Sequence, residues 1–283
     1  MTPNDPLADA RLFRHEAMRT EFTFRFRGLS DVSAPGIARL CIETLDTLES
    51  QLSRFIDGSD ISRINQMRAG ETLYLSEAVH QCLLLALDAC SRTHGLFDIT
   101  QGSRIEHLKS GQNQPAPDIF GSLTIHPDVP AVTCNEPGRV LDLGGIGKGF
   151  ALDRLKLLLT EWEVDDALLA AGASSLLAIG PGEWPVDLTG DADSRRVTLC
   201  NQALSASGTG IQGSHIVHPY GDEAMPSAPC KRVWVAAPGA ALAEVWSTAL
   251  MLVSADEIPA LLAAEPEITG VHADTGGNIL TIR

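Results

Sequence analysis

A glycine-rich segment with a single lysine stands out at residues 144–149, which read GGIGKG. It lies between GRVLDLG (138–144), an apolar segment that we expect to be a strand, and residues 148–164, whose apolar spacing is typical of a helix. Glycines have no Cβ, so their backbone amides can approach a ligand closely. The first turn of a helix adds unpaired N–H groups and a positive dipole end. With the charge of Lys148, the segment favours a phosphate site. The alternative is a tight strand-to-helix turn with a surface lysine.

Two common phosphate loops do not fit this segment. A Walker A loop requires glycine where this chain has Asp142, and a serine or threonine where it has Gly149. The dinucleotide pattern G-x-G-x-x-G requires glycine where the sequence has Phe150 or Leu152. Any phosphate bound here therefore belongs to another class of site, in which Asp142 could contact an adenine, a ribose or a metal.

Composition narrows the partners of the chain. The 283 residues carry a net charge of −15, from 21 basic and 36 acidic residues, without a cluster of Lys and Arg. This argues against binding to nucleic acid or to an anionic membrane surface. The N-terminus does not resemble a signal peptide, and no apolar run approaches the ~20 residues of a membrane span. The six cysteines form no C-x-x-C pair, so we expect a reduced, cytoplasmic protein.

The elements that must position the loop form an interleaved pattern. Four long helices are expected, at 36–55, 76–95, 148–164 and 240–253, with Ser76 as N-cap and Gly95 at C′ of the second. Strands are expected at 22–28, on both sides of a glycine turn within 165–180, at 231–238 and at the C-terminal ILTIR, with three short ones between 185 and 208. Many strands come in hairpin-like pairs. This favours a mixed α/β protein of the α+β class over a purely parallel sheet.

The loop and its flanks, D-L-G-G-I-x-K-G-[FY]-A, resemble the ApbE family of FAD-dependent protein FMN transferases. Five further stretches resemble family motifs in the same order. They are HEAMRT (15–20), SRFIDGSDISRIN (53–65), GLFDITQGS (95–103), ALSASGTG with SHIVHP (203–219), and AEVWSTALML (243–252). The resemblance spans nearly the whole chain. It implies one ApbE-like domain over 1–283, with two interlocked α/β subdomains (1–135 and 136–283) around a flavin cleft.

The resemblance also implies a site and a reaction. FMN would pass from FAD to a serine or threonine of an acceptor flavoprotein, with Mg²⁺, and AMP would leave. The family's magnesium ligands correspond to the carbonyl of Gly145 and the side chains of Glu244 and Thr248, whose i, i+4 spacing places them on one helix face. We expect His215, His218 and Lys148 to be catalytic. The residues expected to contact FAD are Met18, Phe55, Leu96, Phe97, Asp98, Asp142, Lys148 and Val217.

Five departures from the family pattern leave other functions open. Arg19 replaces a glycine, His218 replaces an aspartate, and Ala173-Ser174 replaces a glycine followed by Asp or Asn. Tyr220-Gly221-Asp222 stands where the family has R-T-G after the proline, and Glu244 is one methylene longer than the family's aspartate. The alternatives are an FAD-binding protein with reduced or lost transferase activity and a hydrolase that splits FAD into FMN and AMP.

Several expected site residues also have plain structural interpretations. Asp98 could satisfy amides in a turn, and Glu244 with Thr248 could be a polar spot on a buried helix. His215 and His218 could lie on an exposed strand face.

Overall fold

The computed structural model describes residues 9–111, 116–208 and 216–283. An eight-stranded sheet is its largest element, and every pair of neighbouring strands in it is antiparallel. In sheet order the strands are β1 (Arg11–Ala17), β2 (Thr20–Phe26), β6 (Ala167–Ala171), β7 (Ser175–Ile179), β10 (Ala203–Gly208), β11 (Arg232–Ala237), β12 (Gly270–Asp274) and β13 (Ile279–Thr281).

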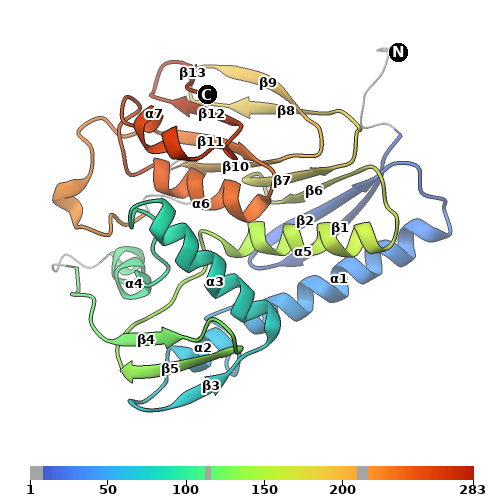
Figure 1. Cartoon of the computed structure of the whole chain (residues 1–283). Helices are drawn as coiled ribbons and strands as arrows, with labels where there is room; N and C mark the ends of the chain where they lie inside the picture. The colour runs from blue at the N-terminus through green and yellow to red at the C-terminus, as the bar shows by residue number, and fades with distance from the viewer. Residues whose placement is uncertain (1–8, 112–115, 209–215) are drawn as a thin grey trace.

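Four long helices are present, which confirms the expected pattern. They are α1 (Ser33–Leu52), α3 (Glu77–Arg92), α5 (Gly147–Glu161) and α6 (Ala240–Leu250). Helices α1, α5 and α6 lie along one face of the large sheet, and α3 lies beyond them (Figure 1). The remaining helices are short: α2 (Asp60–Ile64), α4 (Gly102–Ser110), α7 (Ile258–Leu261), and the 3₁₀ turns η1 (Asp222–Ala224) and η2 (Leu262–Ala264).

Two smaller sheets complete the fold. A three-stranded sheet with the order β3 (Thr72–Tyr74), β5 (Ala131–Glu136) and β4 (Ser122–Ile125) lies beyond α3, on the side away from the large sheet (Figure 1). The hairpin of β8 (Trp184–Thr189) and β9 (Ser194–Leu199) packs against the other face of the large sheet, where Trp184 and Trp234 share a small apolar cluster. Among the described residues, no helix has both the length and the apolar character needed to cross a membrane.

Local sequence explains the elements that flank the site. Phe22, Phe24 and Phe26 alternate along β2 and are fully buried beneath the helices, as a strand with one apolar face requires. The glycine turn expected within 165–180 joins β6 to β7, and Gly172 takes a φ of +59° there. Its amide donates to the carbonyl of Glu21 (2.8 Å), which ties this turn to the β1–β2 hairpin.

Two local expectations were wrong. Residues 138–144 do not form a strand; Val140 makes a single parallel bridge to Gln101, because that partner segment turns at once into α4. Gly95 is not the C′ residue of α3, which ends one position earlier. His94 occupies C′ with a φ of 53°, and the amide of Gly95 donates to the carbonyl of Cys90 (2.7 Å) as the next residue of a Schellman motif.

Ser76 does occupy the N-cap position of α3, but its hydroxyl makes no capping hydrogen bond.

Candidate active site

The glycine loop is held by its own aspartate. Asp142 accepts a hydrogen bond from the amide of Gly144 through Oδ1 (2.7 Å), and its Oδ2 lies 3.0 Å from Nε of Arg54. Ile146 is buried beneath the loop, and the amide of Gly147 donates to the carbonyl of Leu143 (2.8 Å) as α5 begins. The loop therefore enters α5 through a defined turn, with the N-terminus of that helix at its end.

Helices α5 and α6 cross at their N-terminal ends and cap each other. A Cβ on Gly149 would clash with the carbonyl of Ala240, so only glycine permits this approach. Asp153 of α5 accepts hydrogen bonds from the amides of Ala240 (2.7 Å) and Ala241 (2.9 Å), which are unpaired donors at the start of α6. In return, Oε2 of Glu244 on α6 accepts from the amide of Gly149 (2.6 Å). Each helix thus supplies the carboxylate that satisfies the other.

Lys148 and Glu244 form an ion pair. The Lys148 ammonium donates to Oε1 of Glu244 and lies 3.5 Å from the carbonyl oxygen of Gly144. The Glu244 side chain is only 4% exposed, so its charge requires the partners that Lys148 and Gly149 provide. The two residues were expected in separate roles, one toward FAD and the other toward a metal. Their direct contact was not foreseen.

The three residues expected to bind magnesium lie together. Oγ1 of Thr248 donates to the carbonyl of Glu244 (3.0 Å), one helical turn earlier, and a Cβ on Gly145 would lie 3.4 Å from the same Oγ1. Ser207 of β10 extends this polar group, with its Oγ 3.2 Å from Oγ1 of Thr248 and 2.9 Å from Oγ of Ser247. Within the described ranges, no group of three or more His, Cys, Asp or Glu side chains could hold a metal ion. A cation here would depend on mixed oxygen donors.

The segment 96–98 lies under the loop. Phe97 is buried, and its ring would be 3.0 Å from a Cβ on Gly145, whereas Leu96 is half-buried against the core. Asp98 accepts hydrogen bonds from the amide of Thr100 (2.8 Å) and from Nε2 of Gln101 (2.6 Å). These contacts are the ones expected if Asp98 satisfies donors in a turn.

The β1–β2 hairpin ends beside Phe55. Met18 and Arg19 form the two-residue turn, with φ values of 51° and 61°, and the amide of Met18 donates to Oε1 of Glu49 (2.8 Å). The Arg19 guanidinium carbon lies 5.5 Å from the centroid of the Phe55 ring, which is 60% exposed. The turn that contains Met18 therefore lies beside Phe55 through its second residue, Arg19, while Met18 itself packs against the core.

The segment that contains Val217 and His218 follows residues outside the described chain, and His215 is among those residues. Val217 is half-buried. His218 is buried, its Nδ1 accepts from the amide of Tyr220 (3.2 Å), and burial lowers its pKa. The hydroxyl of Tyr220 donates to the carbonyl of His94 (2.6 Å), which anchors the segment to the end of α3. His218 thus does not belong to an exposed polar face.

Sequence reasoning missed Arg54, whose side chain is 5% exposed and bridges Asp142 and Glu106 (2.9 Å). Its neighbour Phe55 belongs to a recognised motif. However, its partners Asp142 and Glu106 are 88 and 52 residues away in the sequence, and a local sequence pattern does not predict ion pairs at such separations. Asp153 was missed for the same reason, because its two partner amides lie on α6.

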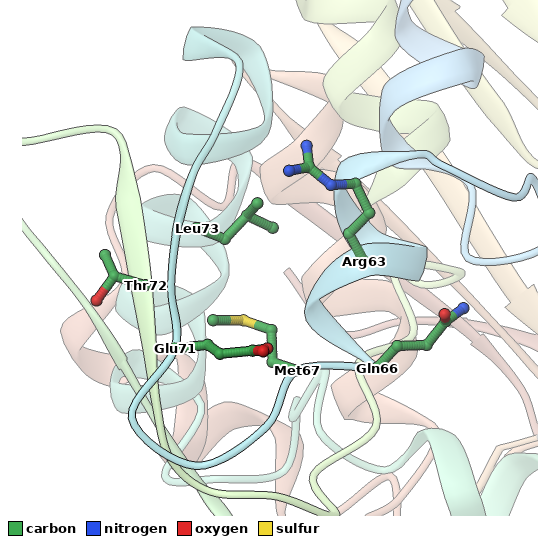
Figure 2. A pocket seen from close by; sticks show the side chains of 6 residues that line it. All are labelled: Arg63, Gln66, Met67, Glu71, Thr72 and Leu73. Atoms are coloured by element: carbon green, nitrogen blue, oxygen red, sulfur yellow. The ribbon is translucent and has the colours of Figure 1, made fainter.

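An open depression of about 400 Å³ lies elsewhere, between α2 and β3, and contains none of the expected site residues. It is lined by Arg63, Gln66, Met67, Glu71, Thr72 and Leu73. Figure 2 shows Leu73 pointing into the space toward the helix, while Thr72 points to the opposite side of the strand. The guanidinium of Arg63 lies 3.5 Å from Asp60, within the same helix. The converging polar groups lie instead at the glycine loop.

Comparison with known proteins supports the resemblance. The family model described as "ApbE family" matches residues 18–272. The chain belongs to the ApbE family. A curated relative, the FAD:protein FMN transferase of Klebsiella pneumoniae (strain 342), is 24% identical over 90% of this chain and 82% of its own length.

Solved ApbE structures share the fold. The flavin transferase ApbE from Vibrio cholerae superposes with a TM-score of 0.79 at 19% identity, covering 96% of both chains. The apo form of the Pseudomonas stutzeri flavinyl transferase ApbE gives 0.79 at 20% identity, covering 96% of this chain and 93% of that one. The expected ApbE-like α+β fold is therefore confirmed.

Proposed function

We propose that this ApbE-family protein transfers FMN from FAD to a serine or threonine hydroxyl of an acceptor flavoprotein and releases AMP. The observation that carries the proposal is the convergence of the glycine loop, Lys148, Glu244 and Thr248 at the crossing of α5 and α6. The name of the curated relative, FAD:protein FMN transferase, describes FMN transfer from FAD to protein, and the solved relative from Vibrio cholerae is named a flavin transferase.

The loop can supply what such a transfer needs. The acceptor oxygen attacks the flavin-side phosphorus of FAD, a P–O bond forms, the pyrophosphate P–O bond breaks, and AMP leaves as the hydroxyl proton passes to solvent or a base. The negative charge of the phosphates would face the N-terminal end of α5 and the Lys148 ammonium. The other proposed FAD contacts are Asp142, Met18, Phe55, Leu96, Phe97, Asp98 and Val217.

The donors present also fit Mg²⁺. The Glu244 carboxylate, the Thr248 hydroxyl and the Gly145 carbonyl are oxygen ligands of the kind a hard cation prefers. When bound, the ion would neutralise phosphate charge. Lys148 now holds Oε1 of Glu244, so the lysine would have to leave that oxygen and could then turn toward a phosphate.

The surroundings of His218 determine the protonation state of its ring. Burial lowers its pKa, so the neutral ring prevails at neutral pH. Because Nδ1 accepts from the amide of Tyr220, the neutral ring carries its proton on Nε2. We therefore propose that His218 acts as a hydrogen-bond donor, whereas His215 keeps its proposed role as an acid or base.

A second candidate is a protein that binds FAD without transfer, because the carboxylate proposed to bind the metal is already paired with Lys148. Incubation with FAD, Mg²⁺ and an acceptor flavoprotein separates the possibilities. Transfer gives an FMN-sized mass increase on the acceptor and an equal amount of AMP. AMP and FMN without a labelled acceptor indicate hydrolysis, and bound, intact FAD indicates a binding protein.

Lys148→Met should lower the transfer rate by about 10²-fold or more, because a developing phosphate charge loses its partner. Lys231→Met is the matched control. Lys231 also pairs with a carboxylate, that of Asp191 (2.6 Å), but lies on the exposed surface near β11. Equal rates for Lys148→Met and wild type would contradict the role given to Lys148.

A further inference from the structure

Among the residues that the structure describes, Arg19 is a cation without an anionic partner. Its guanidinium lies over the face of Phe55, and no carboxylate of residues 9–111, 116–208 or 216–283 lies within ion-pair distance of it. Its neighbour Arg54 is in the opposite situation, with Asp142 and Glu106 both paired to it.

Arg19 is connected to the glycine loop by continuous contacts. Its guanidinium lies over the Phe55 ring, and the Arg54 guanidinium lies 4.7 Å from the centroid of the same ring. Arg54 in turn reaches Asp142, whose other oxygen holds the amide of Gly144. The unpaired charge is therefore connected to Gly144, at the start of the loop, through the side chains of Phe55, Arg54 and Asp142.

The backbone at this position does not favour arginine. Arg19 has a φ of 61°, in the left-handed region that a two-residue hairpin turn requires and that glycine or asparagine adopts at lower cost. Nothing in the described contacts of the guanidinium offsets that cost through an ion pair. Arg19 therefore contributes little to the fold that glycine would not provide.

We propose that Arg19 binds a phosphate group of the flavin nucleotide at the edge of the site, an inference that rests on the proposed function. A guanidinium presents two parallel N–H donors that match two phosphate oxygens. The Phe55 face restricts the guanidinium plane, so less freedom is lost on binding. The shared chemistry is a phosphate monoester or diester, and its source is either the flavin side or the adenosine side of FAD.

Arg19→Gly tests this without endangering the fold, because it removes the guanidinium and suits the left-handed backbone. Thermal unfolding should give an unchanged or higher Tm. Calorimetric titration should show FAD binding weakened about 10- to 100-fold, the usual range for a lost charge-assisted hydrogen bond, and riboflavin binding unchanged. Loss of FMN affinity assigns the flavin-side phosphate, and loss of AMP affinity assigns the adenosine-side phosphate.

Arg39→Ala is the control, since Arg39 is an exposed arginine of α1 paired with Glu43, and its removal changes the net charge equally. Equal FAD affinities of wild type and Arg19→Gly would overturn the Arg19 proposal while leaving the proposed function intact. If wild type binds no FAD, the proposed function fails. Titration with inorganic pyrophosphate then decides whether Arg19 binds phosphate at all. Tighter binding by wild type than by Arg19→Gly keeps Arg19 as a phosphate ligand and rejects only the flavin nucleotide as its source, and equal or absent binding overturns the Arg19 proposal altogether.

Discussion

The two cations of the candidate site, Lys148 and Arg19, have different contacts within the protein. Lys148, on the glycine loop, is bonded to Glu244 in a crossing of two helices that cap each other. Arg19, in the turn between β1 and β2, contacts the ring of Phe55 and forms no ion pair with a carboxylate among the described residues. In the free protein Glu244 neutralises the Lys148 charge and this pair stabilises the helix crossing, whereas the Arg19 charge is available to a ligand at once. Loss of Glu244 should therefore damage the fold, loss of Lys148 should damage transfer, and loss of Arg19 should damage binding without damaging the fold.

The largest effect should come from Glu244→Ala. The change leaves the Lys148 ammonium and the amide of Gly149 without their acceptor in a mostly buried place. We expect a loss of about 3–5 kcal/mol in the free energy of unfolding, measured by urea titration. Glu43→Ala, which breaks an exposed pair with Arg39, should cost under about 1 kcal/mol. Similar losses for both variants would show that the loop-side pair is not structural.

Gly149→Ala and Gly147→Ala test whether the close approach of α5 and α6 requires glycine at position 149 only. A methyl group at 149 would clash with the backbone of Ala240, whereas one at 147 would find only Leu143, at 3.9 Å. We expect the first change to cost about 1–3 kcal/mol through overpacking. The second should be neutral or stabilising by up to about 1 kcal/mol, since it lies at the start of a helix. The free energies of unfolding of both variants are measured by chemical denaturation. An equal loss in the two variants would contradict this account.

The smallest effect concerns pH. Burial lowers the pKa of His218 and of His272 from the ordinary value of 6.5, so the unfolded chain binds protons more readily than the folded protein there. The free energy of unfolding should therefore be highest above about pH 6.5 and fall as the pH drops below it. His218→Gln should reduce this fall, as followed by urea titrations between about pH 7.5 and about pH 5.5. An identical decline in both proteins would mean that His218 is not protonated more easily in the unfolded chain.

Much of the fold could be predicted because its signals are local. The apolar alternation of β2, the glycine turn between β6 and β7, and the periodicity of α1 and α5 are each contained in one stretch of sequence. The strand expected at 138–144 failed because a strand also needs a partner of sufficient length, and the chain at 101 turns into a helix.

The sequence indicated which candidate site residues lie near one another, but not the contacts that they make. The i, i+4 spacing correctly placed Glu244 and Thr248 on one helix face, near Gly145. The pairing of Lys148 with Glu244 joins residues 96 positions apart, and the bridge from Arg54 to Asp142 also crosses the chain. Such pairs depend on how α1, α5 and α6 pack together, and no sequence window contains that information. The roles assigned to the site residues and the boundary at residue 135 stay predictions.

A crystal structure with FAD and Mg²⁺ tests the central claim most directly. The account predicts that the pyrophosphate lies between the glycine loop and Arg19. It also predicts a cation within ~2.5 Å of the Glu244 carboxylate, the Thr248 hydroxyl and the Gly145 carbonyl, with Lys148 released from Glu244. FAD bound elsewhere, for example in the depression lined by Arg63 and Leu73, or FAD bound at the loop with Lys148 still on Glu244 and Arg19 turned away, would contradict it.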